Sequence, residues 1–128
     1  MGDIKYIDTG TPVSSPYSPG LVAGNTLYVS GQIPVDKDGK IPSSIEDQTA
    51  VVLANLKTII EKAGSKVGNV VRCTVFMTNI AEFKQMNGAY KKFFEANGAK
   101  QFPTRSTVQV TKLAVDAARV EIDCIAVM

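Results

Sequence analysis

Strands that are apolar on both faces are the feature that most constrains how this chain folds. Leu27-Tyr28-Val29, Val70-Val71 and the run from Cys124 to Val127 carry apolar or sulfur-containing side chains at consecutive positions. A sheet with helices on one side and water on the other alternates apolar and polar residues along its strands. These runs do not alternate, so we predict that helices cover one sheet face and that a second subunit of a closed oligomer covers the other.

Two stretches have the spacing of amphipathic helices, with apolar residues recurring every three or four positions. The first covers about 44–63 and the second about 80–96. Gly64 and Gly98 follow them and are the expected C-terminal stops, because glycine tolerates the left-handed conformation found there. These stretches predict two helices that are long enough to cover one face of a sheet.

The intervening segments have the patterns of strands and turns. We predict an edge strand at 4–8, a hairpin of 21–23 with 26–30 across Gly24-Asn25, and strands at 70–78, near 107–110 and at 119–127. Residues 9–20 are rich in proline, glycine and serine and are expected to form a loop. The order strand, hairpin, helix, strand, helix, strand, strand predicts a single α+β domain over residues 1–128, with two helices on one sheet face.

Histidine is absent from the chain. Its absence excludes Ser-His-Asp and Cys-His catalysis and all histidine-ligated metal sites. Cys73 and Cys124 fall in strand-like apolar runs, and two cysteines alone do not form a structural zinc site. We therefore expect buried free thiols of a reducing compartment, and no metal.

Charge is nearly balanced, with 14 Lys and Arg against 12 Asp and Glu, and no basic cluster stands out. This balance gives no electrostatic case for a nucleic-acid partner. No apolar run approaches the length of a membrane span, and the N-terminus lacks the apolar core of a signal peptide. We expect no membrane partner and a cytoplasmic location, with an organelle left open.

Arg105 is the first candidate site residue. It stands at the predicted entry to a strand, and no acidic residue lies between Ala96 and Val115. An arginine guanidinium seeks a carboxylate or another anion for its fork of N–H donors. Arg105 is therefore either a solvated surface residue or a residue that a distant acid or a ligand anion must satisfy.

Glu121 is the second candidate, because a carboxylate inside an apolar strand must be paired or have a shifted pKa. Two interpretations stay open. Glu121 either forms a structural ion pair with Arg105, or the two share a pocket in which Arg105 binds a ligand carboxylate and Glu121 holds a water.

Other polar or special positions have both a structural and a functional interpretation. Asn87 lies on the apolar stripe of the second helix and either bridges backbone groups or reaches a site. Ser30-Gly31 either simply ends a strand or allows another group to approach the backbone closely. Tyr17 stands in a proline-stiffened loop, where its ring either packs on the surface or is held over a site.

These residues together resemble a known family. Pro103-Thr104-Arg105-Ser106-Thr107-Val108, with Leu113 and Val120-Glu121-Ile122, resembles the C-terminal signature of the reactive intermediate deaminase family, called RidA or YjgF. Ser30-Gly31-Gln32-Ile33-Pro34 resembles the family's strand-end motif, and Pro16-Tyr17 resembles its N-terminal loop. The spacing of helices and strands agrees across essentially the whole chain.

The resemblance implies a chorismate-mutase-like α+β fold with a mixed sheet, and a homotrimer with sites in the clefts between subunits. It implies a 2-iminobutanoate/2-iminopropanoate deaminase. Such an enzyme hydrolyses 2-aminoacrylate, 2-aminocrotonate and their imine tautomers to 2-oxo acids and ammonia. Small 2-imino and 2-oxo acids would be the partners, and no cofactor is implied.

The resemblance also assigns roles to matching residues. Arg105 would grip the substrate carboxylate, Glu121 would help orient the attacking water, and the backbone at Thr107 would be a second anchor. Thr107 stands where some deaminating members have cysteine, which removes a possible reactive thiol. The other candidates would complete the substrate pocket: Tyr17, Ser30, Gly31 and Asn87.

Two other functions stay open. One is a non-catalytic trimer that binds small carboxylates, since an arginine alone does not separate binding from turnover. The other is RNA cleavage with inhibition of translation, an activity also attached to this family. A near-neutral chain without histidine or a basic stripe argues against the RNA-cleaving function.

Overall fold

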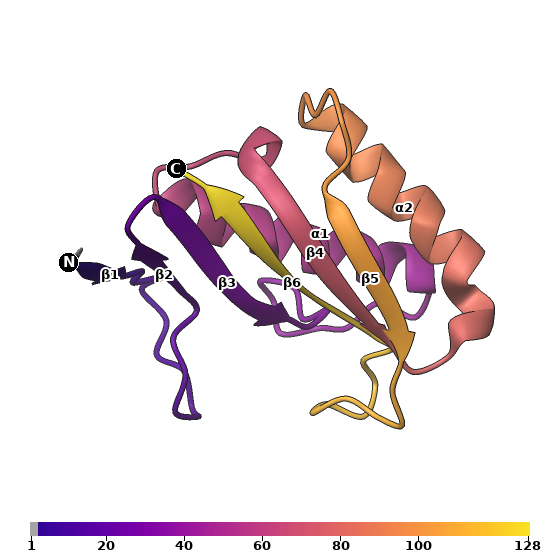
Figure 1. The fold of residues 1–128 in the computed structure, drawn as a ribbon. Helices are drawn as coiled ribbons and strands as arrows, with labels where there is room; N and C mark the ends of the chain where they lie inside the picture. Colours follow the sequence, from indigo (N-terminus) through magenta and orange to yellow (C-terminus); the bar gives the residue numbers. More distant parts are fainter. Residues whose placement is uncertain (1–2) are drawn as a thin grey trace.

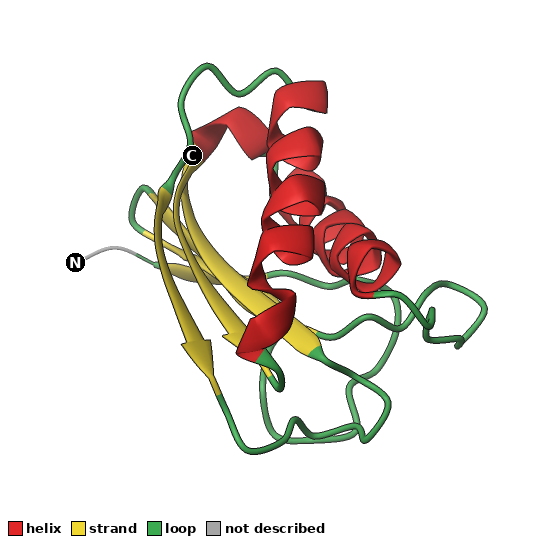
Figure 2. Cartoon of the chain, turned by 90° about the vertical axis from the view of Figure 1, so that its right-hand side faces the viewer, coloured by secondary structure: helices red, strands yellow, loops and turns green. Residues whose placement is uncertain are grey.

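The fold is a six-stranded sheet with two helices on one of its faces, seen from the sheet in Figure 1 and from the side in Figure 2. This computed structural model describes residues 3–128. The elements in chain order are β1 (Ile4–Tyr6), β2 (Gly20–Ala23), β3 (Thr26–Gln32), α1 (Ile45–Lys62), η1 (Val67–Asn69), β4 (Val70–Met77), η2 (Ile80–Glu82), α2 (Phe83–Ala96), β5 (Thr104–Gln109) and β6 (Val120–Val127). The predicted α+β class and order of elements are confirmed, and the structure adds the two short 3-10 helices η1 and η2.

The sheet is mixed and its strand order is β1-β2-β3-β6-β4-β5. Only β4 and β5 pair in parallel, while every other neighbouring pair is antiparallel. The predicted hairpin joins β2 to β3, and Gly24 in its turn has a positive φ of 61°. The last strand of the chain, β6, is therefore a central strand of the sheet and lies between β3 and β4.

Local capping chemistry sets the ends of the helices. The Ser44 hydroxyl accepts a hydrogen bond from the Asp47 N–H at 3.1 Å and so begins α1. Gly64 and Gly98 follow α1 and α2 with φ of 88° and 76°, as expected for helix stops. The predicted second helix is divided, since its first turn is η2 and α2 starts at Phe83.

The core lies between the helices and one sheet face. On β6, alternate residues point into it and are buried: Val120, Ile122, Cys124 and Ala126. Cys73 of β4 lies opposite Cys124, and both are buried free thiols, as predicted. Burial raises the pKa of the Cys73 thiol to about 11 and also raises that of Cys124. The α1 residues that share this core are Ile45, Gln48, Thr49, Val52, Leu53, Leu56, Ile59 and Ile60.

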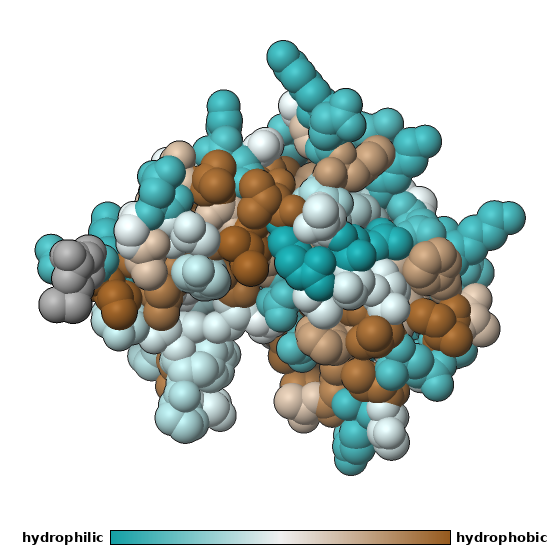
Figure 3. All heavy atoms as spheres, viewed as in Figure 1, coloured by the Kyte–Doolittle hydropathy of each residue, from teal (hydrophilic) through white to brown (hydrophobic). Residues whose placement is uncertain are grey.

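The other sheet face, here called the open face, is uncovered in the single chain (Figure 2). Large apolar side chains that are exposed in the chain include Tyr28, Val71, Val108 and Val127. In Figure 3, which views this side, brown apolar patches gather on either side of a teal hydrophilic band. The open face is thus more polar than the consecutive apolar runs suggested, because β4 and β6 alternate along most of their length. Its cover by a second subunit stays a prediction.

No helix within residues 3–128 combines the length and the apolar character that a membrane span requires.

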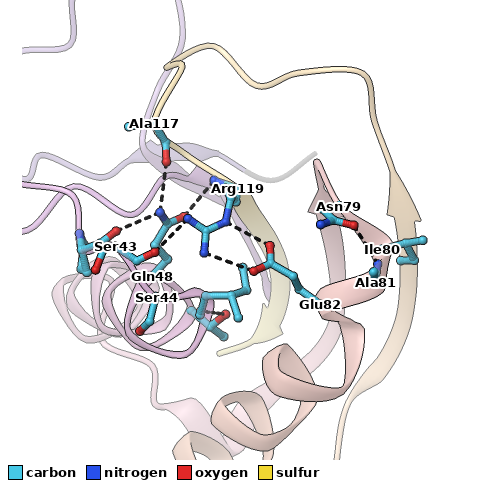
Figure 4. Close-up of polar contacts among 12 residues, drawn as sticks. Ser43, Ser44, Gln48, Asn79, Ile80, Ala81, Glu82, Ala117 and Arg119 are labelled. Atoms are coloured by element: carbon cyan, nitrogen blue, oxygen red, sulfur yellow. Dashed lines mark hydrogen bonds and ion pairs between the residues drawn. The ribbon is translucent and has the colours of Figure 1, made fainter.

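Gln48 is a buried polar residue that ties α1 to the start of β6 (Figure 4). Its side chain is 1% exposed. Its Nε2 donates to the Pro42 and Ala117 carbonyls at 2.9 and 3.0 Å, and its Oε1 accepts from the Arg119 N–H at 2.8 Å. One amide side chain thus makes hydrogen bonds to backbone groups of two loops and of the start of β6. Buried polar groups require such partners.

The Arg119 side chain extends the same network. Its Nε and Nη2 donate to the Glu82 carboxylate at 3.0 and 3.2 Å, and its Nη1 donates to the Ser43 carbonyl at 2.9 Å. Figure 4 shows the guanidinium between the N-terminus of α1 and η2. This bidentate pair anchors the loop that enters β6.

Replacing Gln48 with leucine is expected to lower the free energy of unfolding by about 2–4 kcal/mol. The substitution keeps the volume but leaves the Pro42 and Ala117 carbonyls and the Arg119 N–H without their partner. Urea denaturation measures the change. Gln85→Leu on the exposed side of α2 is the matched control and should change stability little; equal effects of the two variants would contradict the role given to Gln48.

Candidate functional site

Arg105 is the second residue of β5 and so lies at the entry to the strand, as predicted, although the strand starts earlier than expected, at Thr104. It stands opposite Cys73 of β4, whose side chain is fully buried under the helices. Because neighbouring residues in register share a sheet face, the Arg105 side chain turns toward α2. The helix face of the edge strand therefore carries the first candidate group.

Three side chains of α2 surround the Arg105 guanidinium. Its Nη2 donates to Asn87 Oδ1 at 2.7 Å, and its Cζ lies 4.7 Å from the Tyr90 ring centroid and 5.6 Å from that of Phe83. Within residues 3–128 it makes no ion pair, and its remaining N–H donors have no hydrogen bond. Arg105 is thus half-buried and has a side-chain partner in Asn87. The interpretation of Asn87 as a bridge between backbone groups is wrong, because its side-chain oxygen accepts from Arg105.

A cavity of about 260 Å³ opens beside this guanidinium. Its lining consists of Asn87, Tyr90, Lys91, Phe102, Pro103 and Arg105. The lining holds two cations and no carboxylate, and aromatic and proline rings form its walls. Such a cavity suits a small anion with an apolar portion.

Thr107 presents backbone groups at the free edge of the sheet. The Val110 N–H donates to the Met77 carbonyl of β4 at 2.8 Å. The backbone N–H and C=O groups of residue 110, and of the even-numbered residues before it, therefore point toward β4. Along an extended strand the direction alternates, so the N–H and C=O of Arg105 and Thr107 point away from β4. As β5 is an edge strand, these groups are available to a ligand or to another chain.

Glu121 lies on the opposite side of the sheet from Arg105. It alternates with the buried residues Val120 and Ile122 of β6 and therefore projects from the open face. The interpretation that Glu121 pairs with Arg105 within one chain is wrong, because the sheet separates them. Burial, and secondarily the charge of Asp123, raise the pKa of the Glu121 carboxyl above its ordinary value.

Gly31 makes room for the Glu121 side chain. A Cβ at position 31 would overlap the Glu121 carboxylate and approach its Cγ to 3.1 Å. Pairing of β3 with β6 shifts register between Val29 and Gln32, so Gly31 sits in an irregular part of the strand. The strand-end glycine thus serves a close approach, as one of the two sequence interpretations predicted, and the group that approaches it is the Glu121 carboxylate.

Ser30 lies beside this contact at the end of β3, and its hydrogen bonds reach the loop that carries Tyr17. The Ser30 hydroxyl donates to the Ser18 carbonyl at 2.6 Å, and its N–H donates to the Pro19 carbonyl at 2.9 Å. These bonds fix the loop that carries Tyr17, whose side chain is 52% exposed. The Tyr17 ring is therefore free to cover a neighbouring surface while its backbone is held.

The candidate residues therefore form two groups on opposite faces. The Arg105 group consists of Arg105, Asn87 and the Thr107 backbone; the Glu121 group consists of Glu121, Gly31 and Ser30. Tyr17 belongs to neither group and lines a separate hollow with Gln32 and with Asn55 of α1. Phe83 and Tyr90 are not among the site residues predicted from the sequence, and their contacts place them with the first group. Among the residues that the structure describes, no cluster of three or more metal-ligating side chains occurs.

Comparison with known proteins adds family information to this geometry. The family described as Endoribonuclease L-PSP matches residues 9–128. A curated relative, the 2-iminobutanoate/2-iminopropanoate deaminase of Escherichia coli, is 42% identical over 113 residues, which are 88% of this chain and 87% of that protein. A RutC family protein of Pasteurella multocida is 39% identical over 128 residues, covering 99% and 98% of the two chains.

Solved structures agree with the fold. The crystal structure of E. coli TdcF with bound serine has a TM-score of 0.91 and 40% identity, covering 97% of this chain and 98% of that one. The YjgF gene product from E. coli has a TM-score of 0.89 and 39% identity, covering 96% and 97%. The predicted mixed sheet with two helices is thus the fold of these proteins.

Glu121→Gln is expected to stabilise the protein at neutral pH and to flatten its pH dependence. Because the folded state raises the carboxyl pKa, it binds the proton more tightly than the unfolded state. The free energy of unfolding should therefore fall as pH rises through the interval between the unfolded and the raised pKa. Thermal unfolding across mildly acidic to neutral pH measures this, with Glu46→Gln, exposed on α1, as the control. If the stability of Glu121→Gln depended on pH in the same way as that of the parent protein, the raised pKa assigned to Glu121 would be contradicted.

Proposed function

Because the chain belongs to the Endoribonuclease L-PSP family, which is the RidA/YjgF family, we propose that it hydrolyses small 2-imino acids and their enamine tautomers to 2-oxo acids and ammonia. Its substrates would be 2-aminoacrylate, 2-aminocrotonate and the corresponding imines. A curated relative with 42% identity carries the name of this activity.

The unpaired guanidinium of Arg105 is the observation that carries the proposal. It is held against α2 by an uncharged amide and two rings, and no carboxylate within residues 3–128 neutralises its charge. A 2-imino acid supplies the missing carboxylate, and two parallel hydrogen bonds to the guanidinium fork would fix its orientation. The outward Thr107 backbone offers a second contact at the same edge.

Hydrolysis of an imine requires little of the protein beyond the positioning of the substrate and of a water molecule. Water adds to C2 of the imine, forming a C–O bond as the C=N electron pair moves to nitrogen and is protonated. Collapse of the tetrahedral adduct forms the 2-oxo group, breaks the C–N bond and releases ammonia. Glu121 would hold the attacking water and accept its proton, and the raised pKa of Glu121 suits that transfer.

A trimer with sites between subunits is part of this proposal. Arg105 and Glu121 lie on opposite sheet faces of one chain, so one substrate reaches both only if they come from different copies. The bare open face and the free backbone edge of β5 are consistent with such an assembly. In the proposed cleft, Arg105 of one subunit faces the Glu121 group of its neighbour, with Tyr17 closing over the substrate.

The family description also names an endoribonuclease, which keeps RNA cleavage as the competing function. The chain has a formal net charge of only +2 and no histidine to act as a general base. RNA affinity that falls steeply with added salt would favour that alternative. A trimer that binds 2-oxobutanoate without turnover would instead favour the non-catalytic carboxylate binder.

Arg105→Ala is expected to leave the fold intact and to cost about 2–4 kcal/mol in transition-state binding, because the substrate carboxylate loses its fork. A threonine dehydratase generates the imine in the presence of semicarbazide, which traps it, and the rate of 2-oxobutanoate formation is followed. The parent should outrun the trap and Arg105→Ala should not.

Lys92→Ala is the control for this assay, since it removes a cation from the exposed side of the same helix and should keep parental activity. Arg105→Lys keeps the charge without the fork and should recover only part of the rate. No effect of the folded parent protein on 2-oxobutanoate formation would refute the deaminase proposal.

Mixing two inactive variants tests where the site lies. Arg105→Ala and Glu121→Gln subunits are unfolded together and refolded, so that mixed trimers form. If each site takes Arg105 from one subunit and Glu121 from the next, about a quarter of the sites in randomly mixed trimers are intact. Recovered activity in the mixture is expected. Activity no higher than that of either variant alone would place both residues in one chain's site and contradict the shared cleft.

A further inference from the structure

The cradle around Arg105 is built from one face of a single helix. Phe83, Asn87 and Tyr90 are spaced by four and three positions, so they lie along one side of α2. All three contact a residue of β5, the strand beyond the connection that follows this helix. The segment from Phe83 to Arg105 is therefore a helix-and-strand unit that ends in a held cation.

The two rings and the amide contact the guanidinium in different ways. Tyr90 and Phe83 lie 4.7 and 5.6 Å from Cζ, within the range of cation–π attraction, whereas Asn87 accepts one in-plane N–H. Arginine has a long side chain with considerable rotamer entropy, and this entropy must be lost before both N–H groups can meet a carboxylate. A side chain that is already immobilised binds its anion without that cost.

The Tyr90 hydroxyl takes no part in holding Arg105. It is buried and has no hydrogen-bond partner of conventional geometry within the described chain, although it lies beside the Cys73 thiol. Burial, and then this neighbour, raise the Tyr90 pKa well above its ordinary value, so the phenol stays neutral. The ring face is thus the part of Tyr90 that acts on the guanidinium.

Resting on the function proposed above, we propose that Phe83 and Tyr90 are positioning residues that hold the Arg105 guanidinium, with Asn87, in the orientation that receives the substrate carboxylate. The aromatic faces attract the cation without neutralising it. An acidic residue in their place would occupy the same donors that the substrate needs. This assigns to two residues of an apolar stripe a role in substrate affinity.

The test uses Tyr90→Phe, Tyr90→Leu and Phe83→Leu. The first keeps the ring face and removes only the hydroxyl; the other two remove a ring. Phe83 is 37% exposed, so Phe83→Leu tests the proposal without opening the core, and thermal unfolding checks that all variants fold. Binding of 2-oxobutanoate is measured by calorimetry, and the order parameter of the Arg105 Nε–Hε bond in the ligand-free protein is measured by NMR relaxation.

Tyr90→Phe should match the parent in both measurements. Each ring deletion should weaken 2-oxobutanoate binding roughly 3- to 30-fold and lower the order parameter of the Arg105 Nε–Hε bond, because the guanidinium loses a contact that holds it. A purely structural role of the rings would change the melting temperature without changing that order parameter. Parental affinity and a parental order parameter in both folded ring deletions would overturn the proposal.

Failure of the proposed function has a different signature. In that case the parent neither hydrolyses imines nor binds 2-oxobutanoate, and Arg105→Ala changes neither result. The ligand-free NMR measurement still decides the positioning role: a lowered order parameter of the Arg105 Nε–Hε bond in both ring deletions supports it, and an unchanged order parameter overturns it.

Discussion

Burial of one sheet face beneath α1 and α2 is the constraint on which the rest of this structure depends. Once Val120, Ile122 and Cys124 point into the core, the strand alternation sends Glu121 to the opposite face. The same rule, applied through the register of Cys73 with Arg105, turns Arg105 toward α2. The two charged residues are thus separated by the requirement that the sheet has one apolar side, and their separation makes the proposed site depend on a neighbouring subunit.

The polarity around Arg105 follows a second constraint, that a cation must be held without being neutralised. Asn87 contributes an oxygen without a negative charge, and Phe83 and Tyr90 contribute ring faces. Elsewhere in the chain, Arg119 shows the alternative, since a bidentate bond to Glu82 and a bond to the Ser43 carbonyl occupy its guanidinium. One arginine therefore closes a structural junction, while the other keeps N–H donors without a protein partner in residues 3–128.

Features that depend on nearby residues could be predicted from the sequence. Ser44 and Gly64 bound α1, and Gly24-Asn25 turns the hairpin, because caps and tight turns are decided within a few positions. Features that depend on strand order could not be predicted in this way. Nothing local indicates that Gln48 meets Ala117 and Arg119, or that Glu121 and Arg105 lie on opposite faces, since both facts require β6 to lie beside β4. Asn87 was identified as an anomaly on an apolar stripe, but its partner is set by the docking of α2 against β5.

The central position of β6 has a consequence for how the protein is made. Five strands precede β6 in the chain, yet the sheet order places it between β3 and β4. As the chain leaves the ribosome, β1 to β3 can pair as one piece and β4 with β5 as another, but no strand joins them until β6 emerges. Until then the edges of β3 and β4 lie open to any extended segment nearby. Nascent chains that stall before Val120 would therefore expose two partial sheets with unpaired strand edges. Such edges are prone to aggregation, which chaperones prevent.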